Sequence, residues 1–337
     1  MSSRTPFRLL AEEAAMHTVT YLEAVNEALR EEMERDPAVF LMGEDVSWNL
    51  MGATGGLREQ FGFERVRDTP ISEAGFVGAG AGAAMVGMRP VVHMLIAPFL
   101  YVAFDQIVSI VAKSTYLYGG QSKMPITLMA PMVYNAGNAA QHSDRPYSTL
   151  MTIPGLKLVA PATAADAKGL LKAAIRDDDP VICFEDAALW GNKGEVPDGD
   201  HVIALGVADV KREGSDVTVV AVSGAVLHAL SAAEQLEAEG ISVEVVDLRS
   251  IVPLDRDAVL TSVAKTGRLV IADPAHEMGS VASEVSAIVA EKGFWSLQAP
   301  IVRVTTPHTH IPYSAELERP LYPNPERIMA AVRGLMA

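Results

Sequence analysis

The sequence has 337 residues, of which 49% are apolar, so it is long enough for two domains with sizeable cores. Its 27 Lys and Arg against 42 Asp and Glu residues give a formal net charge of −15, which argues against nucleic acid or an anionic membrane as the main partner. The single cysteine, Cys183, excludes an intramolecular disulfide framework and a cysteine-rich zinc or iron–sulfur cluster.

The N-terminal residues contain no apolar signal core, and two acidic residues stand where a transit peptide would avoid them. The charge-free stretches 74–88 and 90–104 are shorter than the roughly 20 apolar residues that a membrane-spanning helix needs. We therefore expect a cytoplasmic protein without a membrane segment. We also expect residues 1–15 to be an N-terminal extension with little structural role.

The first half of the chain alternates between helical periodicity and short apolar runs typical of buried strands. The predicted helices are Leu22–Arg35, Glu73–Val86, Phe99–Leu117 and Ala164–Arg176. The predicted strands are Val39–Met42, Pro90–Met94, Ile126–Ala130, Leu156–Val159 and Val181–Phe184. An acidic turn, Gly43-Glu44-Asp45, follows the first of these strands.

The second half shows the same alternation more clearly. Its predicted strands are Asp216–Ser223, Ser242–Leu248, Arg268–Asp273 and Ile301–Thr305. Its predicted helices are Ala225–Glu239, Asp255–Lys265 and Ser280–Lys292. Continuous apolar strands separated by amphipathic helices indicate parallel sheets covered on both faces, so the predicted fold class is α/β.

The stretch between Gly191 and His201 is polar, rich in turn residues and without periodicity, which is typical of a domain boundary. We predict two α/β domains in series, over residues 16–192 and 202–337.

The spacing Gly78-x-Gly80-x-x-Ala83 matches a dinucleotide fingerprint. That motif requires a strand immediately before the glycines, whereas here a turn and a helix start precede them. We favour a helix whose small residues let another helix approach closely.

Glu73 follows a Thr-Pro-x-Ser sequence and begins this apolar helix. A first-turn acid facing the positive end of the helix dipole is the simpler interpretation. However, a carboxylate desolvated by such a helix would be costly without a hydrogen-bonding or cationic ligand.

His142 lies in a loop rich in Gly, Asn and Ser, where many histidines are merely surface residues. A loop histidine beside a rigid scaffold is also the usual proton-transfer group. The remaining histidines, His308-x-His310 included, have no carboxylate or cysteine at metal-ligand spacing, which argues against a zinc site.

Seven blocks in the same order give the chain, from about Thr18 onward, a specific resemblance to one family. They are GEDV (43–46), RVRDTPISEAGFVGAGAGAAMVGMRPV (65–91), FDQIV (104–108), AAQHS (139–143), PGLKLVAP (154–161), DAKGLLKAAIRDDDPV (166–181) and VDLRSIVPLD (246–255). The family comprises the β subunits of the thiamin diphosphate-dependent, decarboxylating component of 2-oxo acid dehydrogenase complexes, including pyruvate and acetoin dehydrogenases. The resemblance implies a pyrimidine-binding (transketolase-like) domain followed by a transketolase C-terminal-like domain.

The resemblance also implies site residues. Glu73 matches the family glutamate that hydrogen-bonds the aminopyrimidine ring of the cofactor and so helps to create its nucleophilic carbon. Phe99 matches a residue packed against that ring, and Ile71 one that lines the pocket. His142 matches a histidine that faces the substrate and the incoming lipoyl group.

Some related subunits bind a potassium ion, mainly through backbone carbonyls. The matching positions here are Ile126, Ala174, Ile175, Asp177 and Asp179.

The Gly-Asp-Gly motif, with which thiamin enzymes hold the diphosphate through Mg²⁺, does not occur in this sequence. The resemblance therefore implies that an α subunit supplies Mg²⁺ and the diphosphate half of the site in an α₂β₂ heterotetramer, and that a lipoyl-bearing acyltransferase core is a further partner. The AAQHS segment favours a pyruvate or acetoin substrate over branched-chain ones.

Two alternatives remain open. A C-terminal subunit of a split transketolase shares the fold, although no phosphate-binding cluster is evident in the sequence. A non-catalytic assembly subunit is the other alternative, and the presence of both Glu73 and His142 argues against it.

Overall fold

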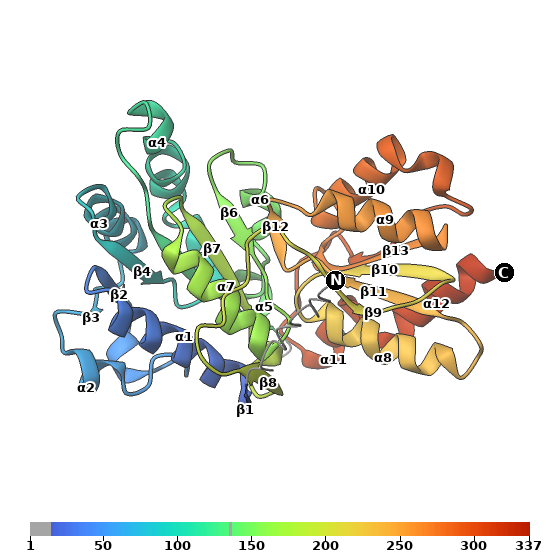
Figure 1. Cartoon of the computed structure of the whole chain (residues 1–337), viewed down its shortest axis with the longest axis horizontal. Helices are drawn as coiled ribbons and strands as arrows, with labels where there is room; N and C mark the ends of the chain where they lie inside the picture. Colours follow the sequence, from blue (N-terminus) through green and yellow to red (C-terminus); the bar gives the residue numbers. More distant parts are fainter. Residues whose placement is uncertain (1–14, 135–136) are drawn as a thin grey trace, which may run out of the picture.

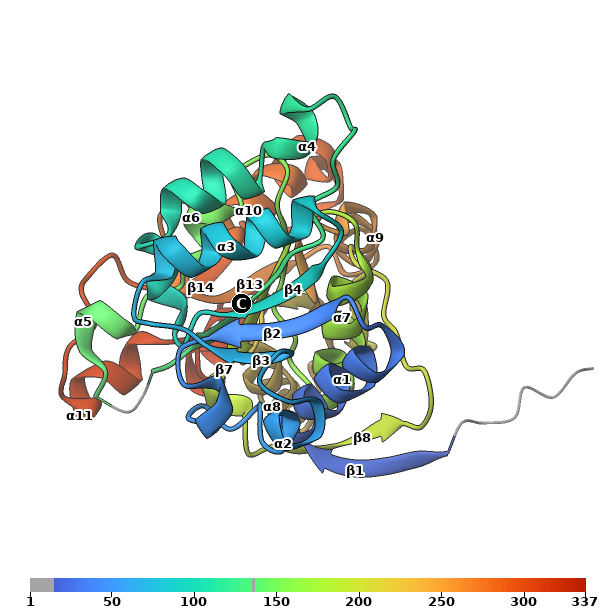
Figure 2. The same ribbon diagram turned by 90° about the vertical axis from the view of Figure 1, so that its left-hand side faces the viewer.

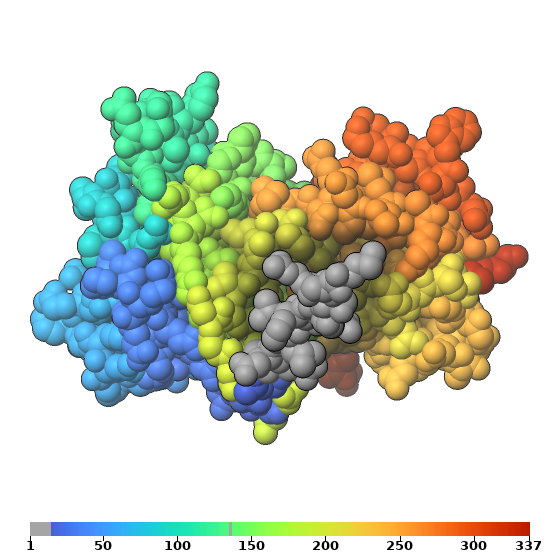
Figure 3. All heavy atoms as spheres, viewed as in Figure 1, coloured from blue at the N-terminus to red at the C-terminus, as the bar shows by residue number. Residues whose placement is uncertain are grey.

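The computed structural model describes residues 15–134 and 137–337. They form two α/β lobes that lie side by side, the first from blue to green and the second from yellow to red (Figure 1). Figure 3 shows the outer surface of the two lobes in the same view. Apart from residue 15, the expected extension over residues 1–15 lies outside the described residues.

The first lobe is built on a seven-stranded sheet in the order β12-β6-β7-β5-β4-β2-β3. Every neighbouring pair is parallel except β12–β6. The strands are β2 (Val39–Gly43), β3 (Val66–Asp68), β4 (Arg89–His93), β5 (Thr127–Met132), β6 (Lys157–Val159), β7 (Val181–Asp186) and β12 (Ser250–Val252). Most of these segments are apolar and fully buried, because helices cover both faces of the sheet.

Two helices, α1 (Tyr21–Arg35) and α7 (Ala164–Arg176), pack on one face of this sheet, and α3 (Glu73–Met85) packs on the other (Figure 2). A capping box fixes the start of α1, since the Thr20 side chain accepts from the Glu23 backbone N–H and Glu23 accepts in return. Shorter helical segments are η1 (Val46–Trp48), α2 (Leu57–Phe61), η2 (Ala97–Tyr101), η3 (Gln106–Val111), α4 (Ser114–Leu117), α5 (Ala139–His142), α6 (Tyr147–Leu150) and η4 (Ala187–Leu189).

The second lobe has a five-stranded sheet in the order β14-β13-β10-β11-β9, parallel except for β9. The strands are β9 (Asp209–Arg212), β10 (Val217–Ala221), β11 (Val243–Asp247), β13 (Leu269–His276) and β14 (Val302–Thr306). The helices are α8 (Ala225–Glu237), α9 (Arg256–Thr266), α10 (Val281–Lys292), η5 (Phe294–Ser296), α11 (Ala315–Glu318), η6 (Arg319–Leu321) and α12 (Pro325–Met336). α8 and α12 cover one face, and α9 and α10 cover the other.

The lobes are joined by shared core and by ion pairs. One apolar cluster runs from α3 and η3 of the first lobe to α9 and α10 of the second. The buried Asp166 of α7 accepts hydrogen bonds of 2.7 Å from both Lys211 and Arg249 of the second lobe. Strand β12, from the second half of the chain, completes the sheet of the first lobe.

Two sequence predictions differ from the structure. The single helix predicted over Phe99–Leu117 is broken into the 3₁₀ turn η2, the π-helical η3 and the short α4. The spacing of apolar residues does not distinguish 3₁₀, α and π helices, because all three are right-handed and have similar numbers of residues per turn.

The second difference is a strand, β8 (Lys193–Pro197), within the stretch Gly191–His201, where the sequence indicates no regular structure. This strand pairs antiparallel with β1 (Met16–Thr20), a partner some 175 residues away in the sequence, so no local pattern reveals it.

Cys183 is a buried free thiol in β7, as its apolar surroundings predict, and burial raises its pKa. Within the described residues, no helix combines the length and the apolar character needed to cross a bilayer.

Candidate functional site

Four candidate residues follow four neighbouring strands at the carboxyl edge of the seven-stranded sheet. Glu73 follows β3, and Glu44 follows β2. Phe99 follows β4, and His142 follows β5. Because β3, β2, β4 and β5 are adjacent and parallel, the segments after them gather at one edge, where open α/β sheets bind ligands.

Glu73 is the first residue of α3 and is only 6% exposed. Its carboxylate makes no hydrogen bond or ion pair within the described residues, and the Ser72 side chain does not cap the helix. Every residue after Glu73 in α3 is apolar or glycine. A buried carboxylate on such a helix is therefore free to bind a hydrogen-bonding ligand.

Glu44 is a second buried carboxyl group beside it. Burial raises its pKa, and the negative charge of Glu73 raises it further. Its Oε1 is buried without a hydrogen-bond partner in the described residues. Gly43, which precedes it, has a φ of +155°, and a Cβ there would lie 2.4 Å from the His93 carbonyl oxygen, so only glycine lets β2 end in this geometry.

The sequence alone does not indicate a role for Glu44, because an acid in a turn after a strand is ordinarily solvated. Its position directly after a fully buried strand was the one available signal.

Phe99 and His142 contact each other. Their ring centroids lie 5.6 Å apart with an interplanar angle of 88°, an edge-to-face arrangement. Both side chains are half-buried, and the His142 Nδ1 is buried without a partner in the described part of the chain. The structure therefore brings together an aromatic face and an imidazole with an unused nitrogen.

Ile71 lies apart from this contact. It stands in the loop before α3 with 84% of its side chain exposed. Because the side chain is so exposed, a closed pocket at Ile71 would need a second chain to complete it.

The predicted potassium positions gather where α7 ends and β5 begins, but their carbonyls already accept hydrogen bonds. The Ile175 and Asp177 carbonyls accept from the Arg89 guanidinium at 3.1 and 2.8 Å. The Ile126 and Ala174 carbonyls accept from the backbone N–H groups of Val181 and Asp177.

The nearby Asp179 carboxylate lies 3.1 Å from the Lys157 ammonium. Protein cations thus occupy part of this region, while each carbonyl keeps a second lone pair. Elsewhere, the described residues contain no cluster of three or more His, Cys, Asp or Glu side chains that could hold a metal ion.

Comparison with known proteins identifies both lobes. Residues 17–190 match the pyrimidine-binding domain of transketolase, and residues 206–328 match the transketolase C-terminal domain. The β subunit of acetoin:2,6-dichlorophenolindophenol oxidoreductase from Bacillus subtilis is 46% identical over 334 residues, which cover 94% of this chain and 97% of that protein. The chain belongs to the family of 2-oxo acid and acetoin dehydrogenase β subunits.

Other members of this thiamin-enzyme family are almost equally similar. The β subunit of 2-oxoisovalerate dehydrogenase from Bacillus subtilis is 45% identical, with 95% of this chain and 99% of that protein covered. The β subunit of the pyruvate dehydrogenase E1 component from Rhizobium meliloti is 44% identical, with 95% and 70% covered. Such similar values do not distinguish between the substrates in these names.

Among solved structures, a split-gene transketolase described as an inactive β4 tetramer superposes with a TM-score of 0.79 at 26% identity. The match covers 94% of this chain and 98% of that one. The dehydrogenase β subunits thus share their two-domain fold with a transketolase subunit.

Proposed function

We propose that this chain is the β subunit of a thiamin diphosphate-dependent dehydrogenase that cleaves a 2-oxo acid, such as pyruvate, or acetoin, and passes the acyl group to a lipoyl group. The observation that carries the proposal is the buried, unpartnered Glu73 carboxylate at the carboxyl edge of the sheet. Family membership and the contact between Phe99 and His142 support it.

The residues at this edge fit an aminopyrimidine ring. Glu73 offers a carboxylate to a ring nitrogen, and Phe99 offers an aromatic surface on which a flat ring can pack. When bound, thiamin diphosphate supplies a carbon nucleophile for the substrate carbonyl. Glu73 would hydrogen-bond a nitrogen of that ring and so influence its protonation state, and the apolar α3 would exclude water from that bond.

His142 would face the substrate and exchange a proton with it. Its Nδ1 has no partner in the described residues, so a substrate oxygen or a lipoyl sulfur can take that place. The edge contact with Phe99 restrains the imidazole ring. We assign His142 to positioning the substrate and to proton transfer during acyl transfer.

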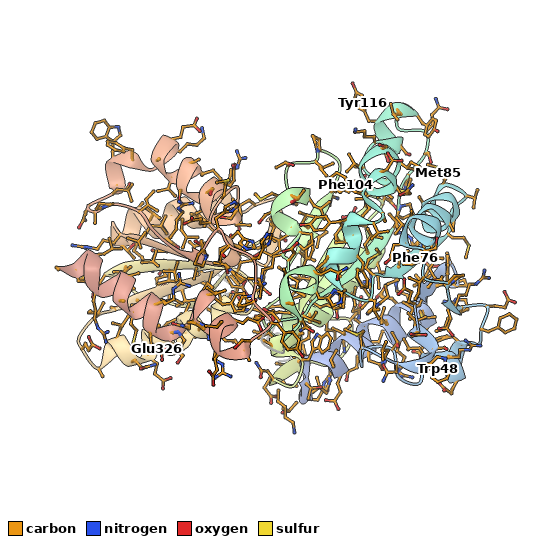
Figure 4. All side chains as sticks on the ribbon, turned by 180° about the vertical axis from the view of Figure 1, so that it is seen from behind. Trp48, Phe76, Met85, Phe104, Tyr116 and Glu326 are labelled. Atoms are coloured by element: carbon orange, nitrogen blue, oxygen red, sulfur yellow. The ribbon has the colours of Figure 1, made fainter. Side chains whose placement is uncertain are left out.

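The diphosphate half of the site is assigned to an α subunit, together with its Mg²⁺, in an α₂β₂ assembly. Two features of this chain support that assignment. First, the outward side of α3 is formed by glycine and apolar residues. Second, apolar side chains beside α3 and in the segment from η2 to α4 are exposed. They are Ile71, Val86, Tyr101, Val102, Phe104, Tyr116 and Leu117. Figure 4 labels Met85, Phe104 and Tyr116 on this end of the first lobe. So much exposed apolar surface is typical of a subunit interface.

A lipoyl-bearing acyltransferase core is proposed as the further partner of that assembly.

A potassium ion at the carbonyls of Ile126, Ala174, Ile175 and Asp177, near Asp179, is a separate proposal. Their second lone pairs and the negative end of α7 favour it, and Arg89 opposes it. A higher melting temperature in KCl than in NaCl at equal ionic strength would support it, and equal values would contradict it.

The test of the function is thiamin diphosphate-dependent dye reduction by this chain co-expressed with its candidate α subunit. Pyruvate, acetoin and 3-methyl-2-oxobutanoate are compared, with each subunit alone as control. We expect activity only in the mixture, with one preferred substrate. A stable complex inactive with all three, but active with sugar phosphates, would favour the split-transketolase alternative. A complex inactive with every substrate would favour the non-catalytic alternative.

A further inference from the structure

A cavity of about 790 Å³ opens at the junction of the two lobes. Helices α5 and α6 of the first lobe form one side, and the segments that follow β13 and β14 of the second lobe form the other. Gln141, the neighbour of His142, is part of the lining. The cavity thus lies next to the catalytic histidine, yet it consists only of residues of this chain.

Arg145 is the most unusual group in the lining. It is only 5% exposed, and its guanidinium lies between the rings of Tyr134 and Tyr322, 4.1 and 4.4 Å from their centroids. Its Nη1 donates to the Ser143 carbonyl, whereas Nε and Nη2 have no hydrogen-bond partner in the described residues. No carboxylate of the described residues lies within ion-pair distance, and the negative charge of Asp186 acts on the guanidinium only at longer range. A buried guanidinium is costly unless an anion accepts its free N–H groups, so this arrangement points to an anionic ligand.

Other unused donors lie in the same segment. The hydroxyl groups of Ser143 and Ser148 and the His142 Nδ1 are buried without partners in the described residues, and Ser148 lines the cavity. Buried polar atoms are normally satisfied, so a group of them within seven residues indicates a missing partner rich in acceptors.

The opposite wall adds three imidazoles, from His276, His308 and His310. Against these donors the lining contains one carboxylate, that of Asp144. Arg145, His276 and His310 oppose the effect of burial on the pKa of the Asp144 carboxyl, which places these groups within electrostatic reach of one another. The lining therefore has more side chains that can donate hydrogen bonds than it has carboxylates, which suits a ligand rich in acceptors.

We propose that this cavity binds the anionic end, carboxylate or phosphate, of a small molecule, with Arg145 as its anchor. Carboxylate and phosphate share the acceptor geometry that a guanidinium recognises. The binding of an anion stands on the cavity alone. The further statement that the ligand is a substrate, whose reacting end reaches His142, rests on the proposed function and requires a substrate that carries a second, anionic group away from its reacting carbonyl, which pyruvate and acetoin do not.

The first test is calorimetric titration of the full chain with inorganic phosphate and, separately, with glutarate. We expect saturable binding of at least one probe, at least about tenfold weaker in Arg145→Gln because a charged hydrogen-bonding partner is lost. Arg333→Gln, which removes an exposed arginine on α12, is the matched control and should bind like the wild type. The preferred probe identifies the source, phosphate favouring sugar phosphates and glutarate favouring a substrate with a distal carboxylate. No saturable binding of either probe, or equal binding in Arg145→Gln, would overturn the proposal.

A second variant covers the case in which Arg145→Gln does not fold. Asp144→Asn removes the carboxylate that repels the ligand and should tighten binding. Unchanged or weaker binding in this variant would also contradict the proposal. The titrations measure binding without turnover. Anion binding can therefore be absent while dye reduction succeeds, or present while dye reduction fails. The two outcomes separate this inference from the proposed function.

Discussion

The Glu73 carboxylate lies close enough to Glu44 for its negative charge to raise the pKa of the Glu44 carboxyl. Burial and this negative charge together hold a proton on the Glu44 carboxyl to higher pH than on an exposed glutamate. This relationship, together with the contact between Phe99 and His142, defines the candidate site on this chain.

Glu73→Gln should lower thiamin-dependent dye reduction by the assembled enzyme by about 10² to 10⁴, the usual contribution of a general acid–base group. Glutamine keeps the size of the side chain but not its charge, so the assembly should still form. Comparison of kcat with size-exclusion profiles checks both statements. Wild-type kcat in this variant would remove Glu73 from the mechanism.

His142→Asn should impair transfer to a lipoyl acceptor more than it impairs reduction of a dye. The dye accepts electrons without acyl transfer, whereas the lipoyl reaction needs a proton donor beside the acyl carbon. Parallel assays with the two acceptors measure the difference. Equal losses in both assays would place the role of His142 earlier in the reaction.

Gly82→Leu should block assembly with the α subunit and leave the fold of this chain intact. Gly82 is exposed on α3, and a Cβ there meets nothing within 4 Å, so leucine disturbs only a contact outside the chain. Gly80→Ala is the contrasting variant, because its Cβ would lie 2.9 Å from Val92 and destabilise the core. Circular dichroism and size exclusion of the co-expressed subunits separate the two effects. Normal assembly of Gly82→Leu would exclude this face of α3 from the interface.

Glu185→Gln should stabilise the chain increasingly as pH rises. Burial raises the pKa of the Glu185 carboxyl from 4.5 to about 8, and both of its oxygens lack partners in the described residues. The folded state therefore holds a proton that the unfolded state releases, and the wild type loses stability between about pH 4.5 and 8. The shift corresponds to on the order of 5 kcal/mol.

Urea unfolding of Glu185→Gln and wild type at pH 5, 6, 7 and 8 measures this difference. The difference in unfolding free energy should grow toward pH 8, whereas the exposed control Glu64→Gln should show no such trend. A pH-independent difference would mean that Glu185 is ionised in the folded protein.

The sequence predicts the alternation of strands and helices well where burial is complete on both faces, as in β10, β11 and α7. It fails where tertiary contacts decide. Strand β8 exists through its pairing with β1, and β12 joins a sheet that is otherwise formed by the other lobe. Long-range packing also constrains the segment after Phe99, since a Cβ on Gly155 would lie 2.0 Å from the Ala112 carbonyl oxygen at the end of η3.

The candidate site divides in the same way. Glu73 and His142 are found from sequence because they lie in recognisable blocks. The Arg145 cavity is not found, because its lining comes from positions 101–149, 276–278 and 308–310, which only the folded chain brings together. No cluster of phosphate-binding residues is evident in the sequence, whereas the folded chain brings the residues around Arg145 together as a candidate anion site.

The most direct test of the shared site is calorimetric titration of thiamin diphosphate, with Mg²⁺, into this chain alone, the α subunit alone and the co-purified complex. We predict tight binding to the complex at one cofactor per β subunit, and binding at least about tenfold weaker to either subunit alone. Glu73→Gln in the complex should weaken that binding. Equally tight binding to one isolated subunit, or no effect of Glu73→Gln, would contradict a cofactor site divided between the two chains.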